Sequence, residues 1–190
     1  MYELDLFAGA GGGILGGKIL GWKVVCAVEI EKYAAGVLLQ RQNDGTLHPF
    51  PVWTDIRTFT KRNNNCRRFI RQLQRINDKL VISGGFPCQD ISVAGKGAGI
   101  EGERSGLWGE MWRLVREIRP INVYVENSPM LTSRGIKRVL ADLSELGYNA
   151  AWGVFGADEV GANHIRKRIW INATKNGTYP DKERLQKKRA

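Results

Sequence analysis

The chain has 190 residues, of which 43% are hydrophobic and 25% charged, as expected for one soluble globular domain with a core of its own. No apolar run is long enough to span a bilayer, and no signal peptide is expected before the first strand, so the composition argues against a membrane or secreted protein. The formal net charge of +10 indicates a polyanionic partner such as nucleic acid, although excess charge can also serve solubility alone.

Strands and helices are expected to alternate along the chain. Apolar runs predict strands over 2–7, 22–29, 79–83 and 121–126, a weaker strand over 51–54, and closing strands over 150–155 and 168–173. Helical spacing predicts helices up to about residue 20 and over 32–42, 66–76, 107–118 and 136–146, the last with Gly147 as its C-cap. This alternation is typical of an α/β fold, a doubly wound sheet with helices on both faces. We expect one domain over 1–174 and a basic, flexible tail over 175–190.

The cysteine pattern bears on the redox environment. Cys26, Cys66 and Cys88 are odd in number and lack the spacing of metal ligands. They predict reduced thiols in an intracellular setting and no metal site. The expected location is cytoplasmic, inside a prokaryotic or viral host cell.

A glycine-rich turn, Asp5-Leu6-Phe7-Ala8-Gly9-Ala10-Gly11-Gly12-Gly13, follows the first strand. Glycines let the backbone turn tightly and let a ligand come close, and the helix that follows offers free N–H groups. The turn differs from the dinucleotide fingerprint, because Ile14 stands where the third glycine belongs. A ligand-binding loop is indicated, and a plain strand-to-helix turn is the alternative.

Acidic residues end the next two strands. Glu29 comes 20 residues after Gly9, where an acid commonly accepts hydrogen bonds from ribose hydroxyls. Asp55 could accept a hydrogen bond from an adenine amino group. Together with the glycines, the two acids predict an adenosine-type cofactor, whereas each acid alone is more often a solvated carboxylate or a helix cap.

The tetrapeptide Phe86-Pro87-Cys88-Gln89 follows the strand over 79–83 and two glycines. It puts a cysteine at the carboxyl end of a buried strand, where open α/β sheets bind ligands. Pro87 fixes its own φ and restricts Phe86, so the backbone that presents the thiol is stiff. Position alone leaves two interpretations of Cys88 open: a reactive group, or a small buried apolar residue.

Four sequence blocks resemble those of the cytosine-5 DNA methyltransferases. In the order and spacing of that family, they are Asp5 to Gly12, Gly85 to Gln89, Glu126-Asn127 and Arg166-Lys167-Arg168. The resemblance runs from about Leu4 to Ala173. It implies a Rossmann-like fold that binds S-adenosylmethionine, transfers its methyl group to carbon 5 of cytosine in DNA and releases S-adenosylhomocysteine.

The resemblance also implies catalytic roles. Cys88 would be the nucleophile whose thiolate adds to carbon 6, so that carbon 5 can attack the sulfonium methyl group. Glu126 would bind ring nitrogen 3 and the exocyclic amine, for which a partly protonated, buried carboxyl is suited. Arg168 would face the cytosine carbonyl and Arg166 would anchor the catalytic loop. The two arginines are expected to alternate on one strand and so to point to opposite faces.

The binding sites implied by the resemblance extend beyond these groups. The expected cofactor residues are Asp5, Phe7, Ala8, Gly9, Gly11, Gly12, Glu29, Ile30, Asp55, Ile56, Pro87 and Leu107. The family flips its target base, and residues 89–106 have the composition of a loop that closes over it, with an ordinary connection as the alternative. The expected nucleic-acid contacts are Gln89, Ser92, Lys96, Arg104 and His164. For His164, an exposed loop histidine without a binding role is an equal alternative.

Some features depart from the family pattern. Ser128-Pro129 stands where members usually have Val, and Asn163-His164 where they often have Pro-Gln. After Ala173 the chain is too short for a target-recognition region, so low sequence specificity is expected. Three explanations stay open: a compact enzyme of viral or restriction-modification type, one half of an enzyme whose second polypeptide or homodimer partner supplies recognition, or a relic without turnover.

Two other functions remain as alternatives. RNA is an alternative substrate, less favoured than DNA, because a branch of the family that the chain resembles acts on transfer RNA. A non-catalytic nucleic-acid-binding module would explain the charge but would need none of Cys88, Glu126 and Arg168.

Overall fold

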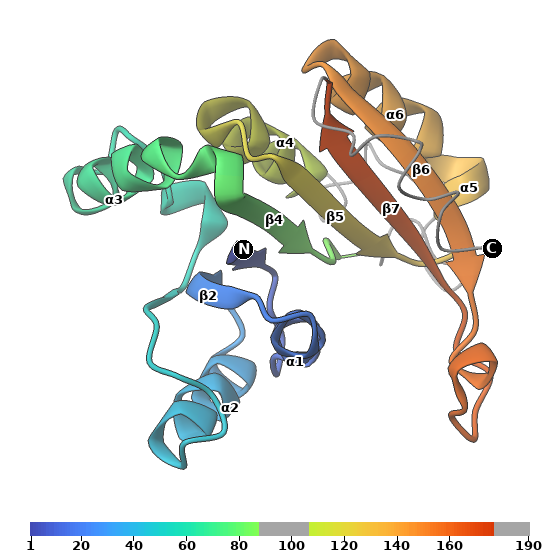
Figure 1. Ribbon diagram of the computed structural model, residues 1–190, viewed down its shortest axis with the longest axis horizontal. Helices are drawn as coiled ribbons and strands as arrows, with labels where there is room; N and C mark the ends of the chain where they lie inside the picture. The colour runs from blue at the N-terminus through green and yellow to red at the C-terminus, as the bar shows by residue number, and fades with distance from the viewer. Residues whose placement is uncertain (88–106, 177–190) are drawn as a thin grey trace, which may run out of the picture.

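The computed structural model describes residues 1–87 and 107–176, in which seven strands form one mixed sheet (Figure 1). The strands are β1 (Tyr2–Leu6), β2 (Lys23–Val28), β3 (Val52–Trp53), β4 (Leu80–Gly84), β5 (Asn122–Asn127), β6 (Tyr148–Phe155) and β7 (Arg168–Lys175). Their order in the sheet is β3-β2-β1-β4-β5-β7-β6. The pairs from β3 to β5 are parallel, whereas β7 runs antiparallel to both β5 and β6.

The direction of winding reverses between β1 and β4. From β1 the chain goes outward through β2 and β3, then returns to β4 on the other side of β1 and continues to β5. Open α/β sheets bind ligands at such a switch point, beyond the carboxyl ends of the strands. The sheet order therefore places a binding site at the ends of β1 and β4.

Helices cover both faces of the sheet, as expected (Figure 1). The helices are α1 (Gly12–Ile19), α2 (Lys32–Asn43), α3 (Asn64–Arg75), α4 (Leu107–Ile118), α5 (Leu131–Arg134) and α6 (Ile136–Glu145). Short 3-10 turns occur at η1 (Ile56–Thr58), η2 (Asn77–Lys79) and η4 (Asp158–Val160). No helix of this described part has the length and hydropathy of a membrane span. The doubly wound, Rossmann-like α/β fold is confirmed.

Alternation along β1 separates the two layers. Leu4 and Leu6 are fully buried in the large core, which also contains Met111 of α4 and Val139 of α6. Glu3 and Asp5 point the other way, toward α1. A smaller core lies on that side, with Ile14 of α1 and Leu38 of α2. One strand thus presents apolar side chains to one layer and carboxyl groups to the other.

Several expected boundaries move by one or two residues. The weak third strand is only two residues long, and β6 begins at Tyr148 rather than at residue 150. β7 continues to Lys175, whose N–H donates to the carbonyl of Ile121, so the expected tail over 175–190 started inside the last strand. Gly147 follows α6 with a φ of 75°, the left-handed conformation that commonly ends a helix. Cys26 and Cys66 are buried free thiols.

Candidate active site

The glycine-rich turn after β1 has an unusual backbone. Phe7, Gly9 and Gly11 have φ values of 58°, 54° and 86°, in the left-handed region that favours glycine. The Gly9 N–H donates to Glu29 Oε2 at 2.6 Å, and Glu29 Oε1 accepts from the Glu31 N–H at 2.7 Å. Glu29 therefore ties the turn to the end of β2. Phe7 is strained as a non-glycine residue, which points to a functional constraint at this position.

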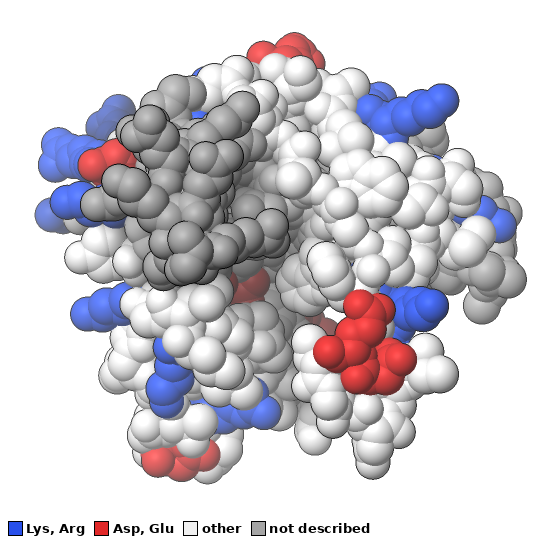
Figure 2. All heavy atoms as spheres, turned by 45° about the vertical axis from the view of Figure 1, so that its right-hand side comes forward, with Lys and Arg blue, Asp and Glu red and all other residues white. Residues whose placement is uncertain are grey.

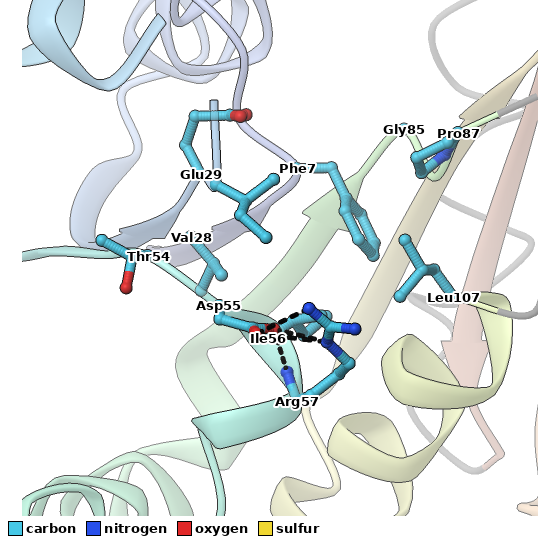
Figure 3. A pocket seen from close by; sticks show the side chains of 11 residues that line it. Phe7, Val28, Glu29, Thr54, Asp55, Ile56, Arg57, Gly85, Pro87 and Leu107 are labelled. Carbon is cyan, nitrogen blue, oxygen red and sulfur yellow. Dashed lines mark hydrogen bonds and ion pairs between the residues drawn. The ribbon is translucent and has the colours of Figure 1, made fainter. Parts of the chain in front are cut away.

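A cavity of about 480 Å³ opens at the ends of β1, β2 and β3 (Figure 3). Phe7 and Leu107 point toward one another across it, and Glu29 lies at its β2 side. The expected cofactor residues that line it are Phe7, Glu29, Ile30, Asp55, Ile56, Pro87 and Leu107. Val28, Thr54 and Arg57 also line it and were missed, because nothing local in the sequence distinguishes them.

Asp55 is engaged by a neighbour that the sequence reasoning did not consider. The Arg57 side chain donates to both carboxylate oxygens of Asp55, at 2.9 to 3.1 Å, and the Arg57 N–H donates to Oδ1 at 2.9 Å. Hydrogen bonds from the Arg57 side chain hold the pKa of Asp55 below its ordinary value. A bound adenine would therefore meet a carboxylate that already has a partner.

A second cavity, also of about 480 Å³, lies over the glycine-rich turn and the ends of β4 and β5. Phe7 and Gly85 line both cavities, so the two adjoin. The expected residues that line the second cavity are Asp5, Phe7, Ala8, Gly9, Gly12, Glu126, Arg166 and Arg168. Ser83, Tyr124 and Trp170 were not anticipated there. Figure 2 shows Asp and Glu side chains deep in the hollow that crosses this face.

Glu126 and Arg168 form an ion pair in the second cavity, with 2.6 Å between Oε1 and Nε. The antiparallel run of β7 beside β5 explains this pair, because it brings the first residue of β7 to the end of β5. Burial raises the pKa of Glu126, although the charges of Arg168 and Arg166 act in the opposite direction. The expectation about the arginines is wrong: Arg166 precedes β7, and both side chains line the same cavity.

The end of β4 is held against both neighbouring strands. The side-chain amide of Asn127 donates to the Phe86 carbonyl at 3.0 Å, which fixes the backbone at Phe86. A Cβ on Gly85 would lie 2.6 Å from Glu126 Oε2, and one on Gly84 would lie 2.6 Å from the Leu6 carbonyl oxygen. Gly84 is therefore required by the close approach of the β1 backbone, whereas a side chain at position 85 would displace the end of the Glu126 side chain.

Some expected site residues stand apart from the cavities. Gly11 lines neither cavity, and its left-handed backbone instead caps α1. His164 is exposed and also lines neither. The expected loop over 89–106 and the expected site residues Cys88, Gln89, Ser92, Lys96 and Arg104 lie outside the described residues.

Two buried carboxyl groups lie beneath the glycine-rich turn. The Ser83 hydroxyl is 2.7 Å from Glu3 Oε1 and 2.9 Å from Asp5 Oδ1, while Glu3 Oε2 and Asp5 Oδ2 have no hydrogen-bond partner within residues 1–87 and 107–176. Burial raises the pKa of Glu3 to about 7 and that of Asp5 to about 8. Glu3 and Ser83 were missed, because their pairing joins strands 80 residues apart in the chain.

The model of the C-5 cytosine-specific DNA methylase family matches residues 1–190. The chain belongs to this family. The Type II methyltransferase M.CviJI of Paramecium bursaria Chlorella virus IL3A is 31% identical over 179 residues, which cover 94% of this chain and 44% of the relative. M.NgoBI of Neisseria gonorrhoeae is 32% identical over 176 residues, covering 90% and 50%. The chain thus spans about half the length, or less, of the curated relatives it matches.

Two solved structures resemble the chain. A protein of an E. coli prophage, described as a DNA modification methyltransferase, superposes with a TM-score of 0.71 at 25% identity, covering 95% of this chain and 48% of that chain. The Dnmt2 methyltransferase of S. pombe gives a TM-score of 0.70 at 19% identity, covering 95% and 53%. The second likeness concerns the fold alone.

Proposed function

We propose that the chain transfers a methyl group from S-adenosylmethionine to carbon 5 of cytosine in DNA. The observation that carries this proposal is the pair of adjoining cavities at the switch point of the sheet, in a chain of the C-5 cytosine methylase family. One cavity offers Glu29 and Asp55, and the other offers Glu126 and Arg168. Phe7 lies where they meet, so one ligand could extend from the first toward the second.

The residues of the first cavity fit the adenosine part of the cofactor. Glu29 Oε1 and Oε2 each accept one backbone N–H, and a carboxylate has further lone pairs for ribose hydroxyls. Phe7 and Leu107 offer apolar surface for the adenine ring. The methionine part would extend over the glycine-rich turn into the second cavity, where α1 begins. S-adenosylmethionine supplies an electrophilic methyl group when bound there.

The proposed chemistry begins at Cys88. Its thiolate adds to carbon 6 of cytosine, which makes carbon 5 nucleophilic. Carbon 5 then forms a bond to the methyl carbon as the sulfonium–methyl bond breaks. Loss of the proton on carbon 5 to a base and cleavage of the bond between carbon 6 and sulfur restore the ring and free Cys88.

Glu126 and Arg168 would hold the ring during these steps. A carboxyl whose pKa is raised by burial can carry a proton and donate it to ring nitrogen 3 as charge develops there. The ion pair to Arg168 orients this carboxyl, and the guanidinium can also donate to the cytosine carbonyl. Arg166 would add positive charge on the same side of the cavity.

DNA is the proposed substrate, with RNA as the second candidate. The family model and the curated Type II relatives are described for DNA, which favours it. The Dnmt2 likeness, at 19% identity, does not bear on the substrate. A second polypeptide or a homodimer partner could supply target recognition. The buried free thiols of Cys26 and Cys66 fit a cytoplasmic, reducing environment.

Covalent trapping tests this function. A duplex with 5-fluorocytosine should form a stable adduct with the chain in the presence of S-adenosylmethionine, because fluorine at carbon 5 blocks the final elimination. Cys88→Ser should form none, whereas Cys66→Ser, a change at a buried thiol, should still be trapped. An adduct that survives Cys88→Ser would refute the mechanism. Trapping on a matching RNA but not on the duplex would move the assignment to RNA.

A further inference from the structure

Helix α3 lies in a stretch of unusual charge. Between Asp55 and Asp78 the sequence contains no acidic residue. Over the same stretch it contains the cations Arg57, Lys61, Arg62, Arg67, Arg68, Arg71 and Arg75. Much of the net charge of +10 is therefore gathered in one short part of the chain.

The two faces of α3 differ sharply. Cys66, Ile70 and Leu73 are buried against the sheet. The opposite face, which we call the arginine face, consists of Arg67, Arg68, Arg71 and Arg75, all exposed. A groove of about 530 Å³ runs along it, lined by Asn64, Arg67, Arg68, Arg71, Gln72 and Arg75.

The arginine face has no carboxylate partner among the described residues. Arg67 Nε donates to the Lys61 carbonyl, and none of its four side chains forms an ion pair with a described acid. In contrast, Arg113 and Arg168 are each paired with glutamates. Like charges spaced four residues apart destabilise a helix, so the fold itself gains nothing from this arrangement.

The arginine face is separate from the active site. The end of α3 leads through η2 into the start of β4, whereas both cavities lie at the carboxyl ends of the strands (Figure 1). No residue of the arginine face lines either cavity. Its positive charge therefore cannot serve the cofactor or the target base directly.

The chemistry of the groove fits a chain of phosphates. Arg67, Arg71 and Arg75 follow one another every four residues, over about 12 Å of helix, a length over which one DNA strand carries roughly three to four phosphates. Guanidinium groups bind phosphate oxygens in a bidentate manner. The groove has no apolar lining residue, so it lacks the anchor with which an amphipathic helix enters a lipid surface.

We propose that the arginine face of α3 is a second nucleic-acid-binding surface, which holds backbone phosphates away from the target base. The inference rests on the proposed function only for the identity of the polyanion. Such contacts add affinity without sequence specificity. They would keep the protein on its substrate while the active site engages individual cytosines.

The test compares two variants that lose the same charge. Arg71→Gln/Arg75→Gln changes the arginine face, and Lys23→Gln/Lys137→Gln removes two exposed lysines elsewhere. Binding of a fluorescent 20-base-pair duplex is measured by anisotropy between 50 and 200 mM salt. The arginine variant should lower the slope of log affinity against log salt by up to about 1.8, and the affinity at 100 mM salt by roughly ten- to sixty-fold. The lysine variant should change both much less.

Equal slopes for the two variants would overturn the proposal. So would unchanged duplex binding combined with lost binding to anionic phospholipid vesicles. Calorimetric binding of S-adenosylhomocysteine should be the same for both variants, which shows that the fold is intact. The two proposals fail separately: absence of Cys88 trapping would refute the methyl transfer, while a lower salt slope in the arginine variant would still support the α3 surface.

Discussion

Glu3 and Asp5 are two carboxyl groups that the fold buries side by side, 1% and 3% exposed. One Ser83 hydroxyl hydrogen cannot serve both carboxyl groups, and each keeps an oxygen without a hydrogen-bond partner in the part of the chain that the structure describes. Burial, the larger cause, together with the charge of Glu3 raises the pKa of Asp5 to about 8, and burial raises that of Glu3 to about 7. The folded chain therefore holds protons that the unfolded chain has already released in the same pH range.

The free energy of unfolding should consequently fall as pH rises from the ordinary values of 4.5 and 3.8 toward 7 and 8. Glu3→Gln removes one of the two groups. We expect it to flatten this pH dependence and to raise stability at pH 8 by about 1–3 kcal/mol. Urea unfolding between pH 5 and 8 measures both effects, with Glu145→Gln, at an exposed position of α6, as the control. A parallel pH profile for Glu3→Gln and the parent chain would contradict the prediction.

Glu29 has a structural role and an expected role in cofactor binding. Its carboxylate holds Gly9 and Glu31 and lines the first cavity. Glu29→Ala should weaken calorimetric binding of S-adenosylhomocysteine by about 1–3 kcal/mol for each buried hydrogen bond lost. Glu31→Ala is the matched control, because the Glu31 side chain caps α2 through the Ala34 N–H and lines neither cavity. Unchanged affinity of Glu29→Ala would remove Glu29 from the site.

At the scale of elements, the end of β4 is the point where fold and site meet. Gly84 faces the Leu6 backbone of β1, and Gly85 faces the end of the Glu126 side chain from β5. Adjacent glycines therefore have different requirements. One is set by the spacing of two strands, and the other by the position of the Glu126 carboxyl.

Alanine at each position should separate these requirements. Gly84→Ala forces the backbones of β1 and β4 apart and should lower the free energy of unfolding by about 1–3 kcal/mol. Gly85→Ala meets a flexible side chain that can move, so it should fold normally but lose methyl transfer by about 10- to 100-fold through the displaced Glu126. Thermal unfolding and labelled-methyl incorporation distinguish the two variants. Equal stability losses with equal activities would show that Gly85 has no part in placing Glu126.

At the scale of the whole molecule, the described residues form one sheet with its helices, and the chain spans 44% of one curated relative and 50% of another. Phosphate contacts position a protein on DNA, whereas base-edge contacts specify the sequence. A cluster of four exposed arginines lies on α3, away from the cavities. We therefore expect the chain, acting by itself, to bind DNA mainly through contacts to the DNA phosphates.

Methylated sites should then share a short context of about one or two flanking bases. Bisulfite sequencing of DNA treated with the purified chain and S-adenosylmethionine measures this directly. Methylation confined to one site of roughly four to six bases would place recognition within the chain itself. Methylation that occurs only after a second polypeptide is added would indicate that the chain is one half of an enzyme whose partner supplies recognition.

Local sequence patterns determined the elements and the edge of the sheet at which the site forms. The apolar periods give the strands and helices, and glycines and acids at strand ends mark the binding edge, because parallel strands end at the same side. Glu29 and Glu126 could therefore be assigned to this edge from the sequence. The exact ends of strands, such as the start of β6, were less well predicted, because the last residues of a strand pair only where a neighbouring strand extends beside them.

The pairing of groups that lie far apart in the sequence depends on how the strands are arranged in space. The ion pair of Glu126 with Arg168, the hydrogen bond of Asn127 to Phe86 and the sharing of Ser83 by Glu3 and Asp5 all depend on which strands are neighbours. The insertion of antiparallel β7 between β5 and β6 sets the first of these. Local periodicity shows which face a side chain occupies but not which strand lies beside it. Strand order is fixed by the packing of the whole sheet, so these contacts could not be derived from the sequence alone.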